Sequence, residues 1–141
     1  MIETNEARLI GFLGADPEVK TTDKGTGYVV LSVATSASWK KPDSNEWETR
    51  TEWHRVVVWG KQASRLNVGK GDKALVIGEI RYREYDDEVT KGKTKIEVKK
   101  RLAEIHAAGV ERLYKAEKTT IASDDGGRLK PALSFSKVPA N

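Results

Sequence analysis

The chain has 141 residues, of which 38% are hydrophobic, and it contains two histidines and no cysteine. This length predicts a single domain, and the composition is typical of a globular protein rather than a disordered or membrane-spanning one. Without cysteine, the sequence excludes disulfides, zinc ribbons and thiol catalysis. Lys and Arg number 25 against 21 Asp and Glu, and the resulting net charge of +4 is too small by itself to indicate a nucleic-acid partner.

The N-terminal part of the chain predicts two strands separated by a turn. Residues 7–14 form a short apolar run, in which Gly11 and Gly14 indicate bulges or close backbone approach. Residues 20–27 are rich in turn-forming residues. Residues 28–36 then alternate with a period of two, which directs three apolar side chains to one side: Val29, Leu31 and Val33.

The middle of the chain predicts a third strand and a short helix. Residues 52–59 form a strand on which Trp53, Arg55, Val57 and Trp59 share one side, and His54, Val56 and Val58 the other. A barrel interior rarely holds an arginine, so we expect the tryptophan side to lie outside. Residues 60–68 form a short helix, which the glycines and aspartate of residues 69–72 end.

Two further strands joined by a long hairpin complete the regular part. A strand begins at residue 74 and continues through residue 85, and the last regular segment covers residues 102–113, although residues 101–108 alone are also compatible with a helix. The hairpin carries one acid, Glu97, within a run of six cations: Lys91, Lys93, Lys95, Lys99, Lys100 and Arg101. Acids at residues 84–88 partly neutralise this run, so a phosphate clamp and a solubilising surface are equally open.

These elements predict an all-β fold, a closed five-stranded barrel of the OB type. One short helix lies between the third and fourth strands, and the long basic hairpin joins the fourth and fifth. The helices of 10–15 residues that a parallel α/β sheet requires between strands are missing. We expect the barrel domain over residues 1–115 and a flexible C-terminal tail over residues 116–141.

Aromatic residues repeatedly adjoin cations along this chain. The pattern occurs at residues 39–41, 53–55, 59–61 and 81–85. Single-stranded nucleic acid binds such surfaces, because its bases stack on flat rings and its phosphates attract cations. The competing interpretation is that the tryptophans are core residues and that the cations are solvated.

The sequence offers no arrangement typical of an enzyme. Its carboxylates lack the spacing of a metal-binding loop, and residues 24–27 lack the phosphate-loop pattern. His54 and His106 are better explained as structural residues than as catalytic bases. We therefore expect a non-enzymatic protein with no cofactor and no metal.

Several motifs, in order along the chain, resemble the bacterial- and phage-type single-stranded DNA-binding proteins. The most specific covers residues 51–61, with the sequence TEWHRVVVWGK, and similar matches occur at residues 9–19, 32–40 and 70–81. The resemblance covers residues 7–85 and again 103–113. It implies an OB fold and a homo-oligomer, usually a homotetramer and otherwise a dimer. It also implies sequence-independent coating of single-stranded DNA in replication, recombination and repair, in the cytoplasm of a bacterial or phage-infected cell.

The resemblance also assigns residues. The family's stacking aromatics fall on Trp39, Trp53, Trp59 and Tyr85, and His54 matches a subunit-interface histidine. We expect the adjoining cations to contact phosphates: Lys40, Lys41, Arg55, Lys61, Arg81 and Arg83.

The C-terminal segment departs from the family pattern. Residues 137–141 lack the acidic tip that recruits replication and repair proteins, so a truncated chain and a divergent form both remain open. We do not expect recruitment through such a tip. The alternative function is an OB-fold interaction module, of the kind found among primosome accessory proteins, whose aromatic face docks a protein.

Overall fold

The computed structural model describes residues 1–117 of the chain. They form six strands and one short helix: β1 (Ala7–Leu13), β2 (Glu18–Thr21), β3 (Gly27–Lys40), β4 (Trp47–Trp59), α1 (Gly60–Ser64), β5 (Lys73–Lys91) and β6 (Thr94–Tyr114). Within this part of the chain, no helix is long and apolar enough to cross a membrane. The tail predicted over residues 116–141 lies, from residue 118 onwards, outside the described residues.

Five of the strands close into a barrel. The strand order is β1-β5-β6-β4-β3-β2, and an additional β1–β3 pairing closes the ring, while β2 pairs with β3 alone. The strands β4 and β6 run parallel, with Val56 opposite Ile105 and Val57 opposite His106. This arrangement confirms the predicted five-stranded barrel of the OB type, with α1 between its third and fourth strands.

The barrel core follows from the period-two alternation of the strands. Val29, Leu31 and Val33 of β3 are buried in it, as predicted, together with Val56 and Val58 of β4. The tryptophan side of β4 therefore lies outside the barrel, which confirms that expectation. The remaining core residues come from the other barrel strands: Leu13, Ala74, Val76 and Ile105.

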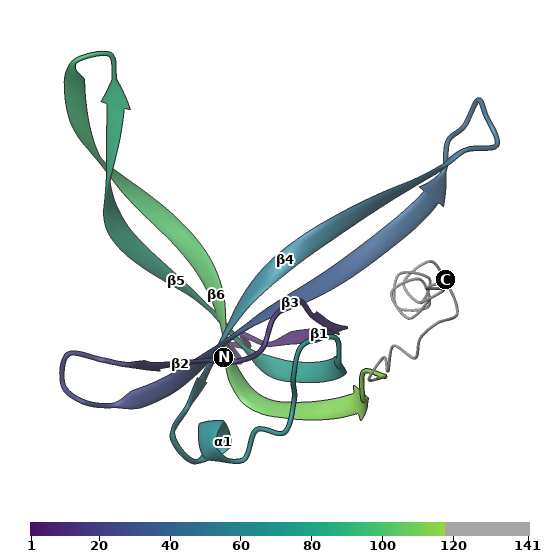
Figure 1. Cartoon of the computed structure of the whole chain (residues 1–141), viewed down its shortest axis with the longest axis horizontal. Coiled ribbons are helices and arrows are strands. Elements are labelled where there is room, and N and C mark those ends of the chain that lie inside the picture. Colours follow the sequence, from purple (N-terminus) through teal and green to yellow (C-terminus); the bar gives the residue numbers. More distant parts are fainter. Residues whose placement is uncertain (118–141) are drawn as a thin grey trace, which may run out of the picture.

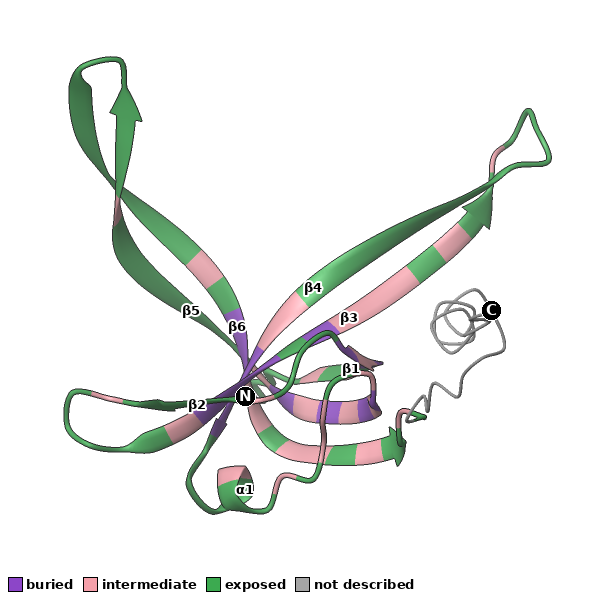
Figure 2. Cartoon of the chain, viewed as in Figure 1, coloured by how far each residue is buried: buried purple, intermediate pink, exposed green. Residues whose placement is uncertain are grey.

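Two long hairpins extend beyond the barrel as arms (Figure 1). The first arm is the outer part of the β3–β4 hairpin, residues 35–52, and its pairing continues unbroken to Lys40 opposite Trp47. The second arm is the outer part of the β5–β6 hairpin, residues 82–103, and its pairing continues to Lys91 opposite Thr94. Figure 2 shows that both arms are mostly exposed, whereas the buried residues gather where they meet the barrel.

Two local features differ from the sequence prediction, and a third decides between alternatives that the sequence left open. The helix α1 ends at Ser64 rather than near residue 68, and Leu66 and Val68 reach the core from non-helical backbone. The short strand β2 was not predicted, because its four residues are all exposed and carry no apolar alternation. Residues 101–108 are strand rather than helix, since pairing with β5 and β4 outweighs their local helical preference.

Candidate nucleic-acid interface

The register gathers many of the predicted site residues on one surface, which we call the outer face. It lies over β4, β5 and β6, on the side of these strands that points away from the core. Antiparallel partners project to the same side, so Arg81 lies opposite Glu104, and Tyr85 opposite Lys100. The predicted residues that this surface brings together are Trp53, Arg55, Trp59, Arg81, Arg83 and Tyr85.

The aromatic rings of the outer face are accessible to a ligand. Trp53 is 62% exposed, Tyr85 39% and Trp59 37%. Values of this size exclude the interpretation that these rings are core residues. Each ring therefore presents surface on which a nucleobase can stack.

Trp39 lies on a different surface of the first arm. It pairs with Glu48, and the unbroken register places both on the opposite side of the hairpin from Trp53. The ring is 41% exposed, so it remains accessible. A strand of nucleic acid that contacts Trp53 and Trp39 must therefore reach both sides of this arm.

The remaining predicted cations differ in their partners. Lys41 forms ion pairs with Glu46 at 3.3 Å and with Glu48 at 3.4 Å. Lys40, at the end of the first arm, and Lys61, in α1, are exposed and form no ion pair within residues 1–117. These two lysines are available to phosphates without breaking an existing contact.

Trp53 rests on the backbone of Gly14. A Cβ atom at Gly14 would overlap the six-membered ring of Trp53, so only glycine permits this placement of the ring. The sequence indicated a close approach at Gly14 and at Gly11, where a Cβ would overlap the carbonyl oxygen of Ala34. The close approach at Gly14 positions the ring of Trp53. The close approach at Gly11 lets β1 and β3 come together where the barrel closes.

Between Trp53 and the end of the first arm, the outer side carries paired hydroxyl groups. The oxygens of Ser36 and Thr51 are 2.8 Å apart, and those of Ser38 and Thr49 are also 2.8 Å apart. This strip is polar but uncharged. It can accept or donate hydrogen bonds without repelling a phosphate.

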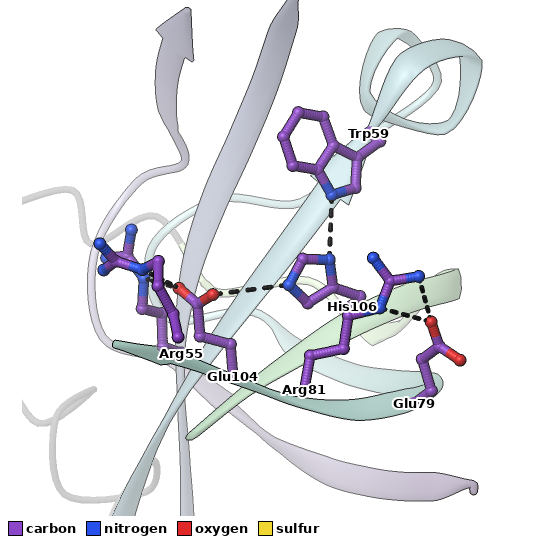
Figure 3. Close-up of polar contacts among 7 residues, drawn as sticks. Arg55, Trp59, Glu79, Arg81, Glu104 and His106 are labelled. Carbon is purple, nitrogen blue, oxygen red and sulfur yellow. Dashed lines mark hydrogen bonds and ion pairs between the residues drawn. The ribbon is translucent and has the colours of Figure 1, made fainter. Parts of the chain in front are cut away.

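A buried carboxylate, Glu104, lies at the centre of the outer face (Figure 3). Its side chain is 6% exposed, and its Oε2 accepts a hydrogen bond of 2.7 Å from the Nε of Arg55. The Nε of Arg83 lies 3.5 Å from the same oxygen. The second oxygen, Oε1, lies 3.5 Å from the Nε2 of His106, whose Nδ1 accepts a hydrogen bond of 3.0 Å from the indole N–H of Trp59.

These contacts determine the charge of Glu104. Burial raises the pKa of its carboxyl group, but the hydrogen bond from Arg55, the charge of Arg83 and the hydrogen bond from His106 outweigh this effect. The net result is a pKa below the ordinary value for glutamate. Glu104 is therefore ionised at neutral pH and partly neutralises both arginines.

Sequence reasoning missed Glu104 as a site residue and treated His106 as a structural histidine. The available signal was a charged residue between two apolar ones, Ala103 and Ile105, in a segment that can be a strand. A strand of that kind directs Glu104 away from the side of Ile105. Its partners Arg55 and Arg83 are 49 and 21 positions away, as counted along the sequence, so the pattern alone does not reveal them.

The second arm is less basic than its cationic run indicates. Lys95 pairs with Glu88 at 3.4 Å, and Lys100 pairs with Asp87 at 2.5 Å. The hydrogen bond and the charge of Lys100 hold the pKa of Asp87 below its usual value. The acids of residues 84–88 thus partly neutralise this arm. Four of its cations have no ion-pair partner in the described part of the chain: Lys91, Lys93, Lys99 and Arg101.

His54 lies on the inner side of β4, where the first arm leaves the barrel. Its Nε2 is 2.8 Å from the hydroxyl oxygen of Thr35, and the residue is only partly buried. This position satisfies one ring nitrogen within the chain. The subunit-interface role of His54 stays a prediction.

A closed barrel whose outer face combines exposed rings with arginines defines an OB-fold binding protein. The model of the Single-strand binding protein family matches residues 4–107. The chain therefore belongs to this family, a family of binding proteins rather than enzymes, as the sequence predicted. Within residues 1–117, no cluster of three or more His, Asp or Glu side chains could hold a metal ion.

Two curated relatives are similar over the barrel region. The single-stranded DNA-binding protein 1 of Xylella fastidiosa is 42% identical over 89 residues, which are 62% of this chain and 65% of that protein. The single-stranded DNA-binding protein of Rickettsia felis is 38% identical over 86 residues, which are 59% of this chain and 57% of that protein. The matched segments thus span less than two thirds of each relative's length.

Two solved structures share the fold. The Plasmodium falciparum single-stranded DNA-binding protein, in complex with single-stranded DNA, has a TM-score of 0.60 at 24% identity, over 81% of this chain and 97% of that one. A deletion mutant of the single-stranded DNA binding protein from Thermus aquaticus has a TM-score of 0.58 at 25% identity, over 78% of this chain and 50% of that one. The likeness supports the OB assignment of the barrel.

Proposed function

We propose that this chain binds single-stranded DNA without sequence preference and protects it during replication, recombination and repair. The observation that carries the proposal is the outer face, where exposed rings and guanidinium groups from the two strands β4 and β5 share one surface. Relatives from Xylella and Rickettsia, which bear the name of single-stranded DNA-binding proteins, support it further.

In this proposal, bases stack on Trp53, Trp59 and Tyr85. Stacking tolerates any base, because every base has a flat face, and this accounts for the lack of sequence preference. Trp39 takes a further base on the other side of the first arm. Phosphates contact the cations predicted from the sequence, namely Lys40, Lys41, Arg55, Lys61, Arg81 and Arg83, and their counterions are released on binding.

We further propose that the protein acts as a homo-oligomer, a homotetramer or a dimer, in the bacterial cytoplasm. One supporting feature is the edge of β1, where only Phe12 and Leu13 pair with β3 and Ile10 is 51% exposed. An open strand edge with an exposed apolar side chain favours pairing with a second copy. Light scattering coupled to size-exclusion chromatography measures the mass in solution, and a monomer at micromolar concentration would contradict this part of the proposal.

Tryptophan fluorescence during titration with oligo-dT tests the binding function. We expect deep quenching at low salt and weaker affinity at high salt, with oligo-dA also bound and duplex DNA bound less well. Absence of quenching at low salt would contradict the proposal and favour a surface that docks a protein. An affinity that does not change with salt would contradict the proposed contacts between cations and phosphates.

A further inference from the structure

We propose that Glu104 and His106 are positioning residues, which hold the outer face in its binding geometry before DNA arrives. Glu104 fixes the two arginines Arg55 and Arg83, and His106 fixes the indole of Trp59. This inference rests on the proposed function and adds to it two residues that do not themselves stack on bases.

The hydrogen bonds determine which ring nitrogen of His106 carries the proton. The indole N–H of Trp59 can only donate, so the Nδ1 of His106 must accept and is therefore unprotonated. The proton of the neutral ring is then on Nε2, the nitrogen that faces Oε1 of Glu104 at 3.5 Å. The buried carboxylate thus selects the form of His106 that accepts the indole proton of Trp59 (Figure 3).

The ring of Trp59 is held from two directions. Its centroid lies 4.8 Å from that of Tyr28 and 6.2 Å from that of His106, in addition to the hydrogen bond. Trp53, by contrast, has no side-chain hydrogen bond to any described residue. A ring whose orientation is already fixed loses less rotational freedom on stacking, so more of its contact energy appears as affinity.

Glu104 holds the two arginines but leaves their terminal nitrogens free to contact phosphates. In both Arg55 and Arg83 the atom nearest the carboxylate is Nε. The two terminal nitrogens of each guanidinium group remain able to donate to a phosphate, since arginine offers five donors in a fixed plane. The side chains keep 28% and 51% of their surface exposed, respectively, which permits that contact.

A pH titration of the unmodified protein tests the role of His106. The charged groups near its ring are Glu104 on its own strand, Arg55 across the sheet, and the residues that line one groove with it: Glu79 and Arg81 on β5, and Glu3 and Glu6 of the N-terminal segment. A proton on the Nδ1 of His106 would abolish the hydrogen bond from Trp59, because that nitrogen could no longer accept.

Nuclear magnetic resonance of the tryptophan indole N–H groups provides the readout for this titration. We expect the Trp59 signal to shift with the same midpoint as the ring signals of His106, while the Trp53 signal does not follow them. A Trp59 signal that stays constant while His106 titrates would overturn the proposal. A purely structural role for His106 predicts no such coupled shift.

Substitution of His106 tests the consequence for binding. His106→Leu removes the acceptor, and we expect it to weaken oligo-dT binding roughly threefold to tenfold, the range of one lost hydrogen bond. His106→Asn offers an oxygen close to the position of Nδ1 and should recover most of that affinity. Gln62→Leu, in the exposed helix α1, is the matched control and should bind as the unmodified protein does.

The outcomes separate this inference from the function on which it rests. Thermal melts first establish that each variant is folded. Unchanged affinity in a folded His106→Leu variant would overturn the positioning role and leave the proposed function intact. Failure of the unmodified protein to bind oligo-dT would overturn the proposed function itself.

Discussion

The two arms carry similar residue types near the barrel and at their ends, but the structure holds these side chains differently in the two regions. Near the barrel, Trp53 rests on Gly14, and Arg55 is held by the buried Glu104. Near the ends, Lys95 pairs with Glu88 through exposed side chains. Exposed ion pairs contribute about 0–1 kcal/mol and rearrange readily. The aromatic and cationic side chains near the barrel therefore have a fixed orientation before a ligand binds. Those toward the ends of the arms can change their orientation.

The largest expected effect comes from removing a ring near the barrel. Trp53→Ala should weaken binding of single-stranded DNA by about 1–3 kcal/mol, the usual contribution of one base stack. The fold should survive, because the ring is largely exposed. Fluorescence anisotropy of a labelled oligo-dT measures the affinity. Trp47→Ala, at the end of the first arm, is the control, and an equal loss there would contradict the distinction between the two regions.

The second-largest effect is expected from removing the charge of Glu104, and it concerns the free energy of unfolding rather than the affinity for DNA. Because the pKa of Glu104 is lowered in the fold, its ion pairs stabilise the protein above the ordinary glutamate value of 4.5 and are lost as the pH falls below it. Glu104→Gln should therefore cost on the order of 1–2 kcal/mol at pH 7. The difference from the unmodified protein should shrink between pH 5 and pH 3, since only the unmodified protein loses this contribution. Urea unfolding at several pH values measures it, and a constant difference would contradict the assignment.

A methyl group at Gly14 should act through Trp53. Gly14→Ala displaces the ring and should weaken binding by about 1 kcal/mol, less than complete removal of the stack. A double-mutant cycle isolates the cause, because Gly14→Ala should have no further effect on affinity in a Trp53→Ala background. An additive loss would show that Gly14 acts independently of that ring.

The smallest effect is expected at the end of the second arm. Lys93→Gln should change affinity by less than about 0.5 kcal/mol and reduce the salt slope by at most about 0.7, the value for one phosphate contact. Lys95→Gln is the paired comparison, since Lys95 already has Glu88 as a partner and should contribute still less. Affinities at four salt concentrations give both slopes. A loss as large as that of Trp53→Ala would reverse the order of the two regions.

The sequence was sufficient to predict the placement of side chains where that placement depends on the alternation within one strand. Alternation along β4 correctly placed Trp53, Arg55 and Trp59 on one side and directed that side outward. The side on which Trp39 lies depends on the pairing of Ala34 with Trp53 across the hairpin, which no alternation within one strand determines.

The network of Glu104 depends on non-local pairing as well. Its segment is compatible with a helix, and it becomes a strand through antiparallel pairing with β5 and a short parallel pairing with β4. Only that arrangement brings Arg55, Arg83 and His106 within reach of one carboxylate. Local propensity could not predict a cluster whose members come from three strands.

The length of the arms has a consequence for amide hydrogen exchange. Beyond the barrel, each arm is a two-stranded ribbon with no packed core of its own, and such ribbons are only marginally stable in water. The backbone amides of residues 35–52 and 82–103 should therefore exchange through local opening, long before those of the core strands. A ligand strand lying along the arms would slow that exchange, so deuterium uptake would map its path residue by residue.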